Sequence, residues 1–431
     1  MLPLLLAVAS LSNLDVISLE IAYTTVMARY YKPVDAAALL AGARNGLVSY
    51  LRERGISSPA IPAATPHADR WRAESEIDRD VALAIARYGS RIRTEDLVAR
   101  TISGELGALR DPYTIFFNPA AYKQFVGFLD GRKTGGIGAE LDVDPQTHAV
   151  RVVDVFPGSP AARAGLQPGD VLTAIDGKTP ATGTPDGLGT QLRGAPGSVV
   201  RVSYARDGSQ QPPLALVRAA IVAPDVLARP LGDVGYIRIR SFGAQAAQQF
   251  DAALTMLRQA HVRAYVLDLR ADGGGYRDAA VAVASHVVDG TIVTTRERGA
   301  PPQVFRAKSA PKLDAPLAVL VNGDTASASE IVAGAVQDAH AGTLVGTKTF
   351  GKGLVQEVFP MPGGAAIKVT TASYVTPGGR DIEGSGILPD VVVAEPADAH
   401  LGQPGRDAQL DRALDVLRGA QPSPNPSRKP E

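Results

Sequence analysis

Hydrophobic residues recur along this chain with more than one period. In the N-terminal part they return at intervals of three and four, which predicts helices over 20–54, 74–88 and 93–109. From Gly135 they alternate with polar residues and are interrupted by Gly, Pro and Asp, as in short strands joined by tight turns. We therefore expect a helical region, with Trp71 as a packing anchor, followed by a strand-rich module.

A third pattern begins beyond residue 225. GYIRIRSF predicts a strand, residues 244–260 place Phe250, Leu254 and Leu257 on one face of a helix, and AYVLDLRADGGGY predicts a buried strand that runs into a glycine-rich turn. A strand, a helix and a second strand in this order form a β-α-β unit, which favours parallel pairing. The C-terminal half is therefore expected to be a mixed α/β core.

The chain starts with a short hydrophobic run over residues 2–9. Its end, Ala7-Val8-Ala9, matches the cleavage site that follows the hydrophobic part of a signal peptide, but a basic segment before it is missing. A bilayer span takes roughly 20 residues, so no stable membrane span is expected. Both a leader and a buried first helix are compatible with this run.

Composition removes several classes of protein. The formal net charge is zero, from 44 basic and 44 acidic residues, so no overall field draws the chain to nucleic acid or to an anionic membrane. There is no cysteine, which excludes disulfides, thiolate metal sites and a thiol nucleophile. No H-E-x-x-H motif occurs either. We expect neither a cofactor nor a metal.

The most informative stretch is 319–356, where a predicted strand, a turn and a helix are followed by a lysine between two glycines. In TASASE, Ser327 stands three residues before Glu330, which is the spacing of a capping box at the start of a helix. An isolated serine of this kind is usually an N-cap. It can also be a nucleophile, because the free N–H groups of a helix N-terminus stabilise a developing oxyanion.

A glycine turn at 273–275 offers a partner for such a nucleophile. It is not a phosphate loop, because neither G-x-G-x-x-G nor GK[ST] is present. Backbone without side chains lets Gly274 or Gly275 approach a reacting carbonyl group. The N–H of one of these glycines and that of Ala328 would then form an oxyanion hole.

A serine hydroxyl also needs a base, and Lys352 is the candidate. A lysine between glycines is usually an exposed loop residue, but its hydrophobic neighbours Phe350 and Leu354 suggest a covered segment. If the segment is extended, Gln356 lies on the same face and its amide can orient the amine. A lysine base must be uncharged, and its reference pKa of about 10.4 falls to near 7 only with burial or nearby positive charge.

A serine-histidine-aspartate hydrolase is the competing chemistry. It would require His261, His286 or His340 beside Ser327, and none of the six histidines lies in a motif typical of a general base.

The string SPAARAGLQPGDVLTAIDG, with the strands around it, is similar to a PDZ domain over about 127–222. The resemblance implies that the loop at 135–138 donates N–H groups to the carboxylate of a peptide, while two leucines four apart on a helix line the side-chain pocket. The residues expected to contact the peptide are Gly136, Ile137, Gly138, Leu188 and Leu192.

Taken together, the motifs from DPYT to IEGSGILPD resemble the C-terminal processing peptidases, tail-specific serine proteases with a Ser/Lys dyad. On the family pattern, TASASE supplies Ser327 as the nucleophile, whereas Ser329 is structural. FGKG supplies Lys352 as the general base, and Gln356 matches the residue that supports it.

The chain departs from the family in one motif. The family's LDLRxNPGG stands here as LDLRADGGG, with Asp272 in place of Asn and Gly273 in place of Pro. The glycine pair that follows is kept.

The resemblance implies a multidomain α+β fold. The expected parts are an N-terminal helical region with a leader (1–126), a β-sandwich-like PDZ domain (127–222), a mixed α/β (β-α-β) catalytic core (223–396), and a C-terminal helix with a disordered tail (397–431).

The implied function is a serine endopeptidase that binds the apolar C-terminal tails of proteins and cleaves near them through an acyl-enzyme. The implied location is extracytoplasmic, in the periplasm or cell envelope, and an adaptor protein is a candidate partner. The alternative is a noncatalytic PDZ-bearing scaffold that binds peptides.

Overall fold

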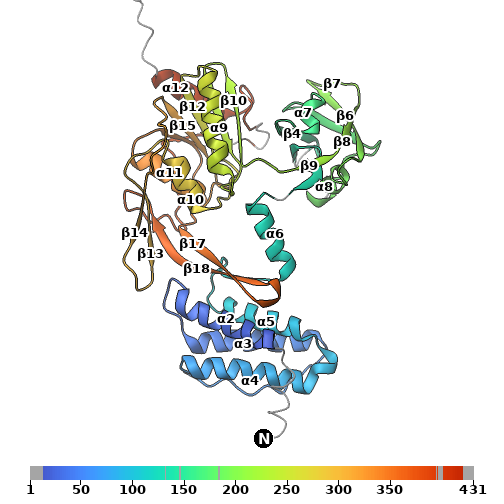
Figure 1. Ribbon diagram of the computed structural model, residues 1–431, viewed down its shortest axis with the longest axis vertical. Coiled ribbons are helices and arrows are strands. Elements are labelled where there is room, and N and C mark those ends of the chain that lie inside the picture. The colour runs from blue at the N-terminus through green and yellow to red at the C-terminus, as the bar shows by residue number, and fades with distance from the viewer. Residues whose placement is uncertain are drawn as a thin grey trace, which may run out of the picture. The chain divides into compact units, whose positions relative to one another are not determined.

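A computed structural model shows three regions in the expected order: helices, a strand-rich module and an α/β core (Figure 1). This order confirms the predicted fold class. The hydrophobic run 2–9 and the C-terminal tail lie outside the described residues. The structure describes residues 13–131, 133–144, 147–182, 185–394, 396 and 401–420.

The chain divides into two compact units. The first comprises residues 1–126, 294–304 and 353–375. The second comprises residues 127–293, 305–352 and 376–431, and so includes both the strand-rich module and the α/β core.

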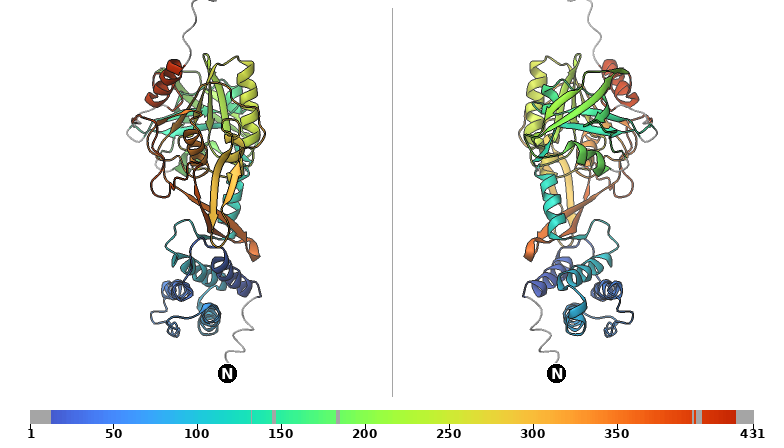
Figure 2. Two further views of the ribbon diagram at one scale, coloured as in Figure 1. Left: turned by 90° about the vertical axis from the view of Figure 1, so that its left-hand side faces the viewer. Right: turned by 90° about the vertical axis from the view of Figure 1, so that its right-hand side faces the viewer.

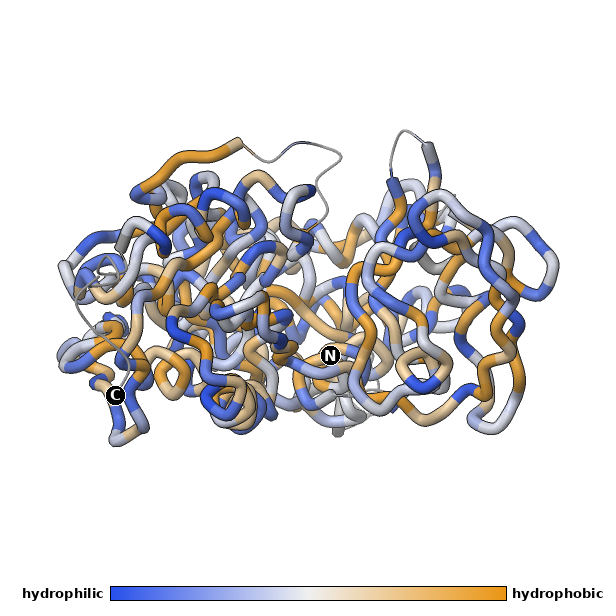
Figure 3. Tube along the Cα trace, turned by 90° about the horizontal axis from the view of Figure 1, so that it is seen from above, coloured by the Kyte–Doolittle hydropathy of each residue, from blue (hydrophilic) through white to orange (hydrophobic). Residues whose placement is uncertain are grey.

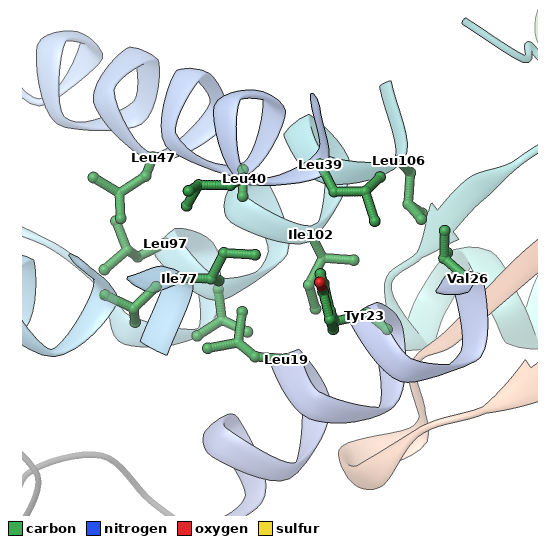
Figure 4. Packing of buried hydrophobic residues seen from close by; sticks show 14 of the residues in the cluster. Leu19, Tyr23, Val26, Leu39, Leu40, Leu47, Ile77, Leu97, Ile102 and Leu106 are labelled. Atoms are coloured by element: carbon green, nitrogen blue, oxygen red, sulfur yellow. The ribbon is translucent and has the colours of Figure 1, made fainter. Parts of the chain in front are cut away.

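The helical part of the first unit buries one continuous hydrophobic cluster (Figure 4). Two of its helices approach each other closely, because a Cβ on Gly104 would lie only 2.4 Å from the carbonyl oxygen of Gly42. Trp71 does not anchor this packing. Its side chain is 67% exposed and lies beneath the guanidinium of Arg70. The helices are α2 (Asn13–Arg29), α3 (Ala36–Glu53), α4 (Arg70–Tyr88), η1 (Gly89–Arg91), α5 (Thr94–Gly107) and α6 (Pro119–Leu129).

An antiparallel sheet completes the first unit. Its central strand is β18, which pairs with β17, with β1 and with residues 294–297 of β13. The pairing of β17 with β18 shifts register between Val355 and Gln356, so β17 contains a bulge. The elements are β1 (Ile115–Phe117), β13 (Thr291–Glu297), β14 (Gln303–Arg306), β17 (Leu354–Pro360), η2 (Pro362–Gly364) and β18 (Ala366–Val375).

The strand-rich module of the second unit has its own core, formed by alternate residues of its strands and by two short helices. Coloured by hydropathy, the chain shows short hydrophobic runs separated by hydrophilic turns (Figure 3). The elements are β2 (Thr134–Gly136), β3 (Ala139–Val143), β4 (Val150–Val155), α7 (Pro160–Arg163), β5 (Val171–Ile175), α8 (Pro185–Leu192), β6 (Val199–Arg206), β7 (Ser209–Gln210), β8 (Leu214–Val217) and β9 (Ala219–Ile221).

The α/β core is built on a six-stranded sheet in the order β10-β11-β12-β15-β16-β19. All neighbouring pairs are parallel except β10 with β11, as the β-α-β pattern predicts. Helices α9 and α12 lie on opposite faces of this sheet (Figure 2). The elements are β10 (Val226–Leu231), β11 (Val234–Ile239), α9 (Ala246–Gln259), β12 (Ala264–Asp268), α10 (Arg277–Ala284), β15 (Leu317–Val321), α11 (Ala328–Asp338), β16 (Thr343–Gly346), β19 (Val391–Val392) and α12 (Ala408–Ala420).

One buried arginine joins the end of β12 to the start of α12. Arg270 is 1% exposed, and its guanidinium donates to both carboxylate oxygens of Asp268 and to both of Asp407 at 2.6–2.9 Å. Burial alone would raise the pKa of Asp268, but Arg270 holds it below its ordinary value. Asp407 also accepts from the N–H of Leu410 and so caps α12. The C-terminal helix is thus tied to the strand that precedes the glycine turn.

Replacing Asp407 by Ala is expected to lower the free energy of unfolding by about 3–5 kcal/mol, because it leaves a buried guanidinium without one of its two carboxylate partners. Urea unfolding followed by circular dichroism measures the change. Asp415→Ala is the matched control on the same helix, since Asp415 is exposed and its pair with Arg418 is worth at most about 1 kcal/mol. Equal losses in the two variants would contradict this role of Arg270.

Candidate active site

The two predicted reactive segments follow neighbouring parallel strands. Strand β12 leads into the glycine turn and β15 leads into Ser327, and the two strands pair directly. The turns are also bonded to each other, since Ala271 N–H donates to Asn322 Oδ1 and Thr325 Oγ1 donates to the carbonyl of Leu269. The site therefore lies at the carboxyl edge of the sheet, where open α/β folds place their ligands.

Ser327 directly precedes the first residue of α11 and has an unusual backbone conformation. Its φ is +59° and its ψ is −114°, a combination that side chains disfavour and glycine tolerates. Such conformations cost of order 1–3 kcal/mol and occur mainly at functional sites. Ser329 is different. It is fully buried in the first turn of α11, and its hydroxyl donates to the carbonyl of Asp272, as expected of a structural serine.

Ser327 is strained, whereas Ser329 lies in a regular helix. Glycine in place of alanine should therefore raise stability at position 327 and lower it at position 329. Ser327→Gly should be more stable than Ser327→Ala by about 1 kcal/mol, because glycine relieves the positive φ. Ser329→Gly should be less stable than Ser329→Ala by about 1 kcal/mol, because glycine is unfavourable in a helix. Thermal and urea unfolding of the four variants measure both differences, and the same sign at both positions would refute the strain.

Glu330 connects the serine to the lysine, a role that the sequence did not reveal. Its carboxylate is fully buried and accepts from the backbone N–H of Ser327 at 2.9 Å and of Lys352 at 2.8 Å, both on Oε2. Its other oxygen accepts from the N–H of Gly351 and the hydroxyl of Thr349. The capping-box spacing identifies only the bond to Ser327. The three bonds to the lysine loop come from a segment about twenty residues further on.

Glu330→Gln is expected to cost about 2–4 kcal/mol in unfolding free energy. Four donors share the carboxylate, whereas glutamine offers one acceptor oxygen and sets its NH₂ group against backbone N–H donors. Peptidase turnover well below the unfolding temperature should also fall, because the serine and the lysine lose their common anchor. Glu95→Gln, at an exposed site, is the control. Unchanged stability and turnover would exclude this role.

The glycine turn is packed directly against the serine. A Cβ on Gly274 would lie 2.9 Å from the Cβ of Ser327 and 2.8 Å from the nitrogen of Ala328, so no other residue fits there. Within the described part of the chain, the N–H groups of Gly275 and Ala328 have no acceptor. The N–H of Gly274 is occupied, since it donates to Asp272 Oδ1 at 2.8 Å.

Asp272 is buried beside this turn. Burial raises its pKa to about 7, and Asp225 adds to the rise, while the N–H of Gly274, Ser329 and Arg238 oppose it. An aspartate in an unfolded chain ionises near pH 3.9. The folded state therefore binds more protons than the unfolded state between about pH 4 and pH 7, and this group's contribution to stability is lost as the pH rises through that window.

Lys352 belongs to the second unit and Gln356 to the first. Lys352 is half-buried and its backbone is held by Glu330. Gln356 lies in β17, where its amide donates to Thr370 Oγ1 at 3.4 Å. Residues 352–356 do not form the regular extended segment that the sequence predicts. Strand β17 begins only at Leu354, and its bulge lies directly before Gln356.

The histidine alternative finds no support. His286 uses both ring nitrogens elsewhere, on the carbonyl of Pro311 and on Asp251. His340 lies beyond the end of α11, and the helix alone extends about 16 Å from Ser327 at 1.5 Å per residue. His261 follows α9, and its backbone N–H bonds within that helix end.

In the strand-rich module, the expected peptide loop leaves two donors open. The N–H groups of Ile137 and Gly138 have no acceptor among the residues that the structure describes. Gly136 lies at the end of β2 and pairs with β9. The side chains of Ile137, Leu188 and Leu192 are buried in the core of the module.

Two negative findings concern only the described residues. No group of three or more His, Cys, Asp or Glu side chains there is arranged to hold a metal ion. No helix within those ranges is long and apolar enough to cross a membrane.

Comparison with known proteins identifies a peptidase family and a PDZ domain in this chain. Residues 233–393 match the model of peptidase family S41, and residues 151–206 match a PDZ domain. The chain is 38% identical over 340 residues to a carboxyl-terminal-processing protease of Synechocystis, covering 76% of this chain and 78% of the relative. It is 36% identical over 331 residues to one of Bartonella bacilliformis, covering 72% and 75%. A solved S41 protease from Bacteroides fragilis aligns with a TM-score of 0.60 at 17% identity, covering 93% of this chain and 97% of that one.

The family match, the PDZ domain and the curated relatives together define a PDZ-bearing serine-type peptidase. The chain belongs to the carboxyl-terminal-processing proteases of peptidase family S41. Because the family consists of peptidases, the alternative of a noncatalytic scaffold is not supported.

Proposed function

We propose that the chain is an endopeptidase that binds the apolar C-terminal tail of a protein substrate and cleaves near it with a Ser/Lys dyad. The observation that carries the proposal is the carboxylate of Glu330, which holds the backbone of Ser327 and of Lys352 on a single oxygen atom. A buried anchor of this kind keeps two segments at a fixed separation, as a nucleophile and its base require.

In the proposed reaction, Ser327 attacks the scissile carbonyl and Lys352, uncharged, accepts its proton. The C–N bond breaks as Lys352 returns that proton to the leaving amine, and the acyl group stays on Ser327. Water then attacks the acyl-enzyme while Lys352 accepts its proton. The ester bond to Ser327 breaks, Lys352 returns the proton to the serine oxygen, and the acid product leaves. Gln356 is assigned to orient the amine, on the basis of its position four residues after the lysine.

The N–H of Ala328 and an N–H of the glycine turn are assigned to the oxyanion. Ala328 is the first residue of α11, where N–H groups lack intrahelical acceptors and the helix dipole favours negative charge. Gly275 is the better placed donor of the two glycines, because its N–H has no acceptor in the described part of the chain while that of Gly274 does.

Tail recognition is assigned to the PDZ domain. The open N–H groups of Ile137 and Gly138 suit a terminal carboxylate, and Gly136 is assigned to the same peptide-binding loop. Leu188 and Leu192 are assigned to the side-chain pocket, where they would meet apolar tail residues. The relatives' names describe carboxyl-terminal processing, which supports substrates with such tails.

The remaining assignments rest on the sequence. We divide the chain into an N-terminal region, a PDZ domain, a catalytic core and a C-terminal segment, over residues 1–126, 127–222, 223–396 and 397–431. We assign the enzyme to an extracytoplasmic location, in the periplasm or envelope, on the resemblance of residues 2–9 to a leader, with an adaptor protein as a candidate partner.

Turnover of a folded substrate with an apolar C-terminal tag tests the dyad. Ser327→Ala and Lys352→Ala should each lower kcat by at least about 10³-fold, since the attacking hydroxyl or its base is lost. His261→Ala, His286→Ala and His340→Ala should stay within a few-fold of wild type. Full activity of Lys352→Ala would refute the dyad.

A second substrate, identical except for acidic residues in the last three positions, serves as the control for tail recognition. Its kcat/KM should fall at least about ten-fold with wild-type enzyme, because burying charged side chains against the assigned residues Leu188 and Leu192 is costly. Equal kcat/KM values for the two tails would remove tail recognition from the proposal and leave the dyad untouched.

A further inference from the structure

Asp272 is a buried carboxyl group that the proposed reaction does not use. Its side chain is 0% exposed, and Oδ2 has no hydrogen-bond partner in the described structure. The backbone of Asp272 is held in place, because its carbonyl accepts from the N–H of Ala326 and from the hydroxyl of Ser329. Those two residues flank Ser327 and Ala328, so Asp272 is fixed to the segment that carries the serine.

The carboxyl group also occupies a donor of the glycine turn. Oδ1 accepts from the N–H of Gly274 at 2.8 Å, and a Cβ on Gly274 would touch the Cβ of Ser327. A hydrogen bond to an ionised carboxylate is stronger than one to a neutral carboxyl group. Ionised Asp272 therefore holds this N–H firmly, and it also places a negative charge close to where the oxyanion develops.

A proton on Oδ2 weakens the hold on the N–H of Gly274 and removes the negative charge. The atom is free to carry it, since nothing in the described structure donates to that oxygen. Oδ1 then remains a neutral, weaker acceptor for the N–H of Gly274, and the turn loses its negative charge.

The charged groups around Asp272 permit protonation at ordinary pH. The acidic neighbour Asp225 favours the neutral form, and Arg238 of β11 favours the ionised form. Burial outweighs the arginine and raises the pKa of Asp272 to about 7. On its own segment, Asp268 and Arg270 are already paired with each other.

We propose that Asp272 is a positioning residue of the oxyanion turn whose neutral form supports acylation, so that its ionisation limits activity at alkaline pH. The proposal rests on the proposed function, in which the glycine turn and Ala328 stabilise the oxyanion formed by attack of Ser327.

The test compares kcat/KM of Asp272→Asn with wild type from pH 5 to pH 9. Asparagine keeps the acceptor for Gly274 and cannot ionise. The ratio of variant to wild type should be constant below about pH 6 and rise about ten-fold per pH unit above pH 7, until the residual activity of the ionised form is reached. Lys352 affects both enzymes equally and cancels in this ratio.

Asp324→Asn is the matched control, because Asp324 is exposed in the turn before Ser327, and its ratio to wild type should not vary with pH. A ratio for Asp272→Asn that is constant from pH 5 to pH 9 would overturn the proposal, since a merely structural role lowers activity equally at every pH. Asp272→Ser replaces the Asn variant if the latter fails to fold.

Infrared titration of the inactive Ser327→Ala variant tests the ionisation without any turnover. Glu105 and Asp78 are also carboxyl groups of raised pKa, so the spectrum of Ser327→Ala minus that of Ser327→Ala with Asp272→Asn isolates the band of interest. A carboxylic acid band that disappears with a midpoint near pH 7 supports the proposal, and its absence above pH 5 overturns it. If Ser327→Ala remains active, the proposed function fails, whereas the titration of Asp272 is still observed.

Discussion

The site depends on one buried carboxylate. Glu330 is excluded from solvent and accepts four hydrogen bonds, from the serine backbone, the lysine backbone, Gly351 and Thr349. An ionised group is stable in such a place only when its oxygens are satisfied by donors. The charge therefore fixes the path of two loops at once, because a displacement of either would leave a buried acceptor unpaired. Thr349 extends the network by accepting from the N–H of Ile387, so a third segment is held as well.

The α/β sheet supplies the rigid support for this network. Strands β12 and β15 are buried along their whole length and end side by side, which brings the glycine turn and the serine to one edge. Arg270, two residues beyond β12, ties that edge to the C-terminal helix through Asp407. The C-terminal segment thus contributes to the site through an ion pair that is buried on both sides.

Periodicity predicted the elements well and the site in part. The apolar runs of β12 and β15 and the hydrophobic face of α9 are local patterns, so the sequence alone locates them. Ser327 and Lys352 came from motifs whose residues are close in the chain. Glu330 was predicted as a cap only, because its other partners lie about twenty residues away and no local pattern encodes a contact of that range. The bulge before Gln356 was missed for a related reason, since an extra residue in a strand leaves no mark in the alternation of a short polar segment.

Three features of the site oppose stability. Ser327 and Lys352 act in the proposed reaction, and Asp272 is proposed to control its pH dependence. Ser327 has a backbone conformation that suits glycine, Asp272 is a buried carboxyl group with one unsatisfied oxygen, and Lys352 must lose its charge to act as a base. None of the three would persist in a flexible loop, because each would relax into solvent or into an ordinary rotamer. They persist because the sheet edge, the Arg270 ion pairs and the Glu330 hydrogen bonds leave the loops no alternative path. The same packing that imposes these costs also holds Ser327, Lys352 and the glycine turn at fixed positions, so loosening any one of these supports should lower activity as well as stability.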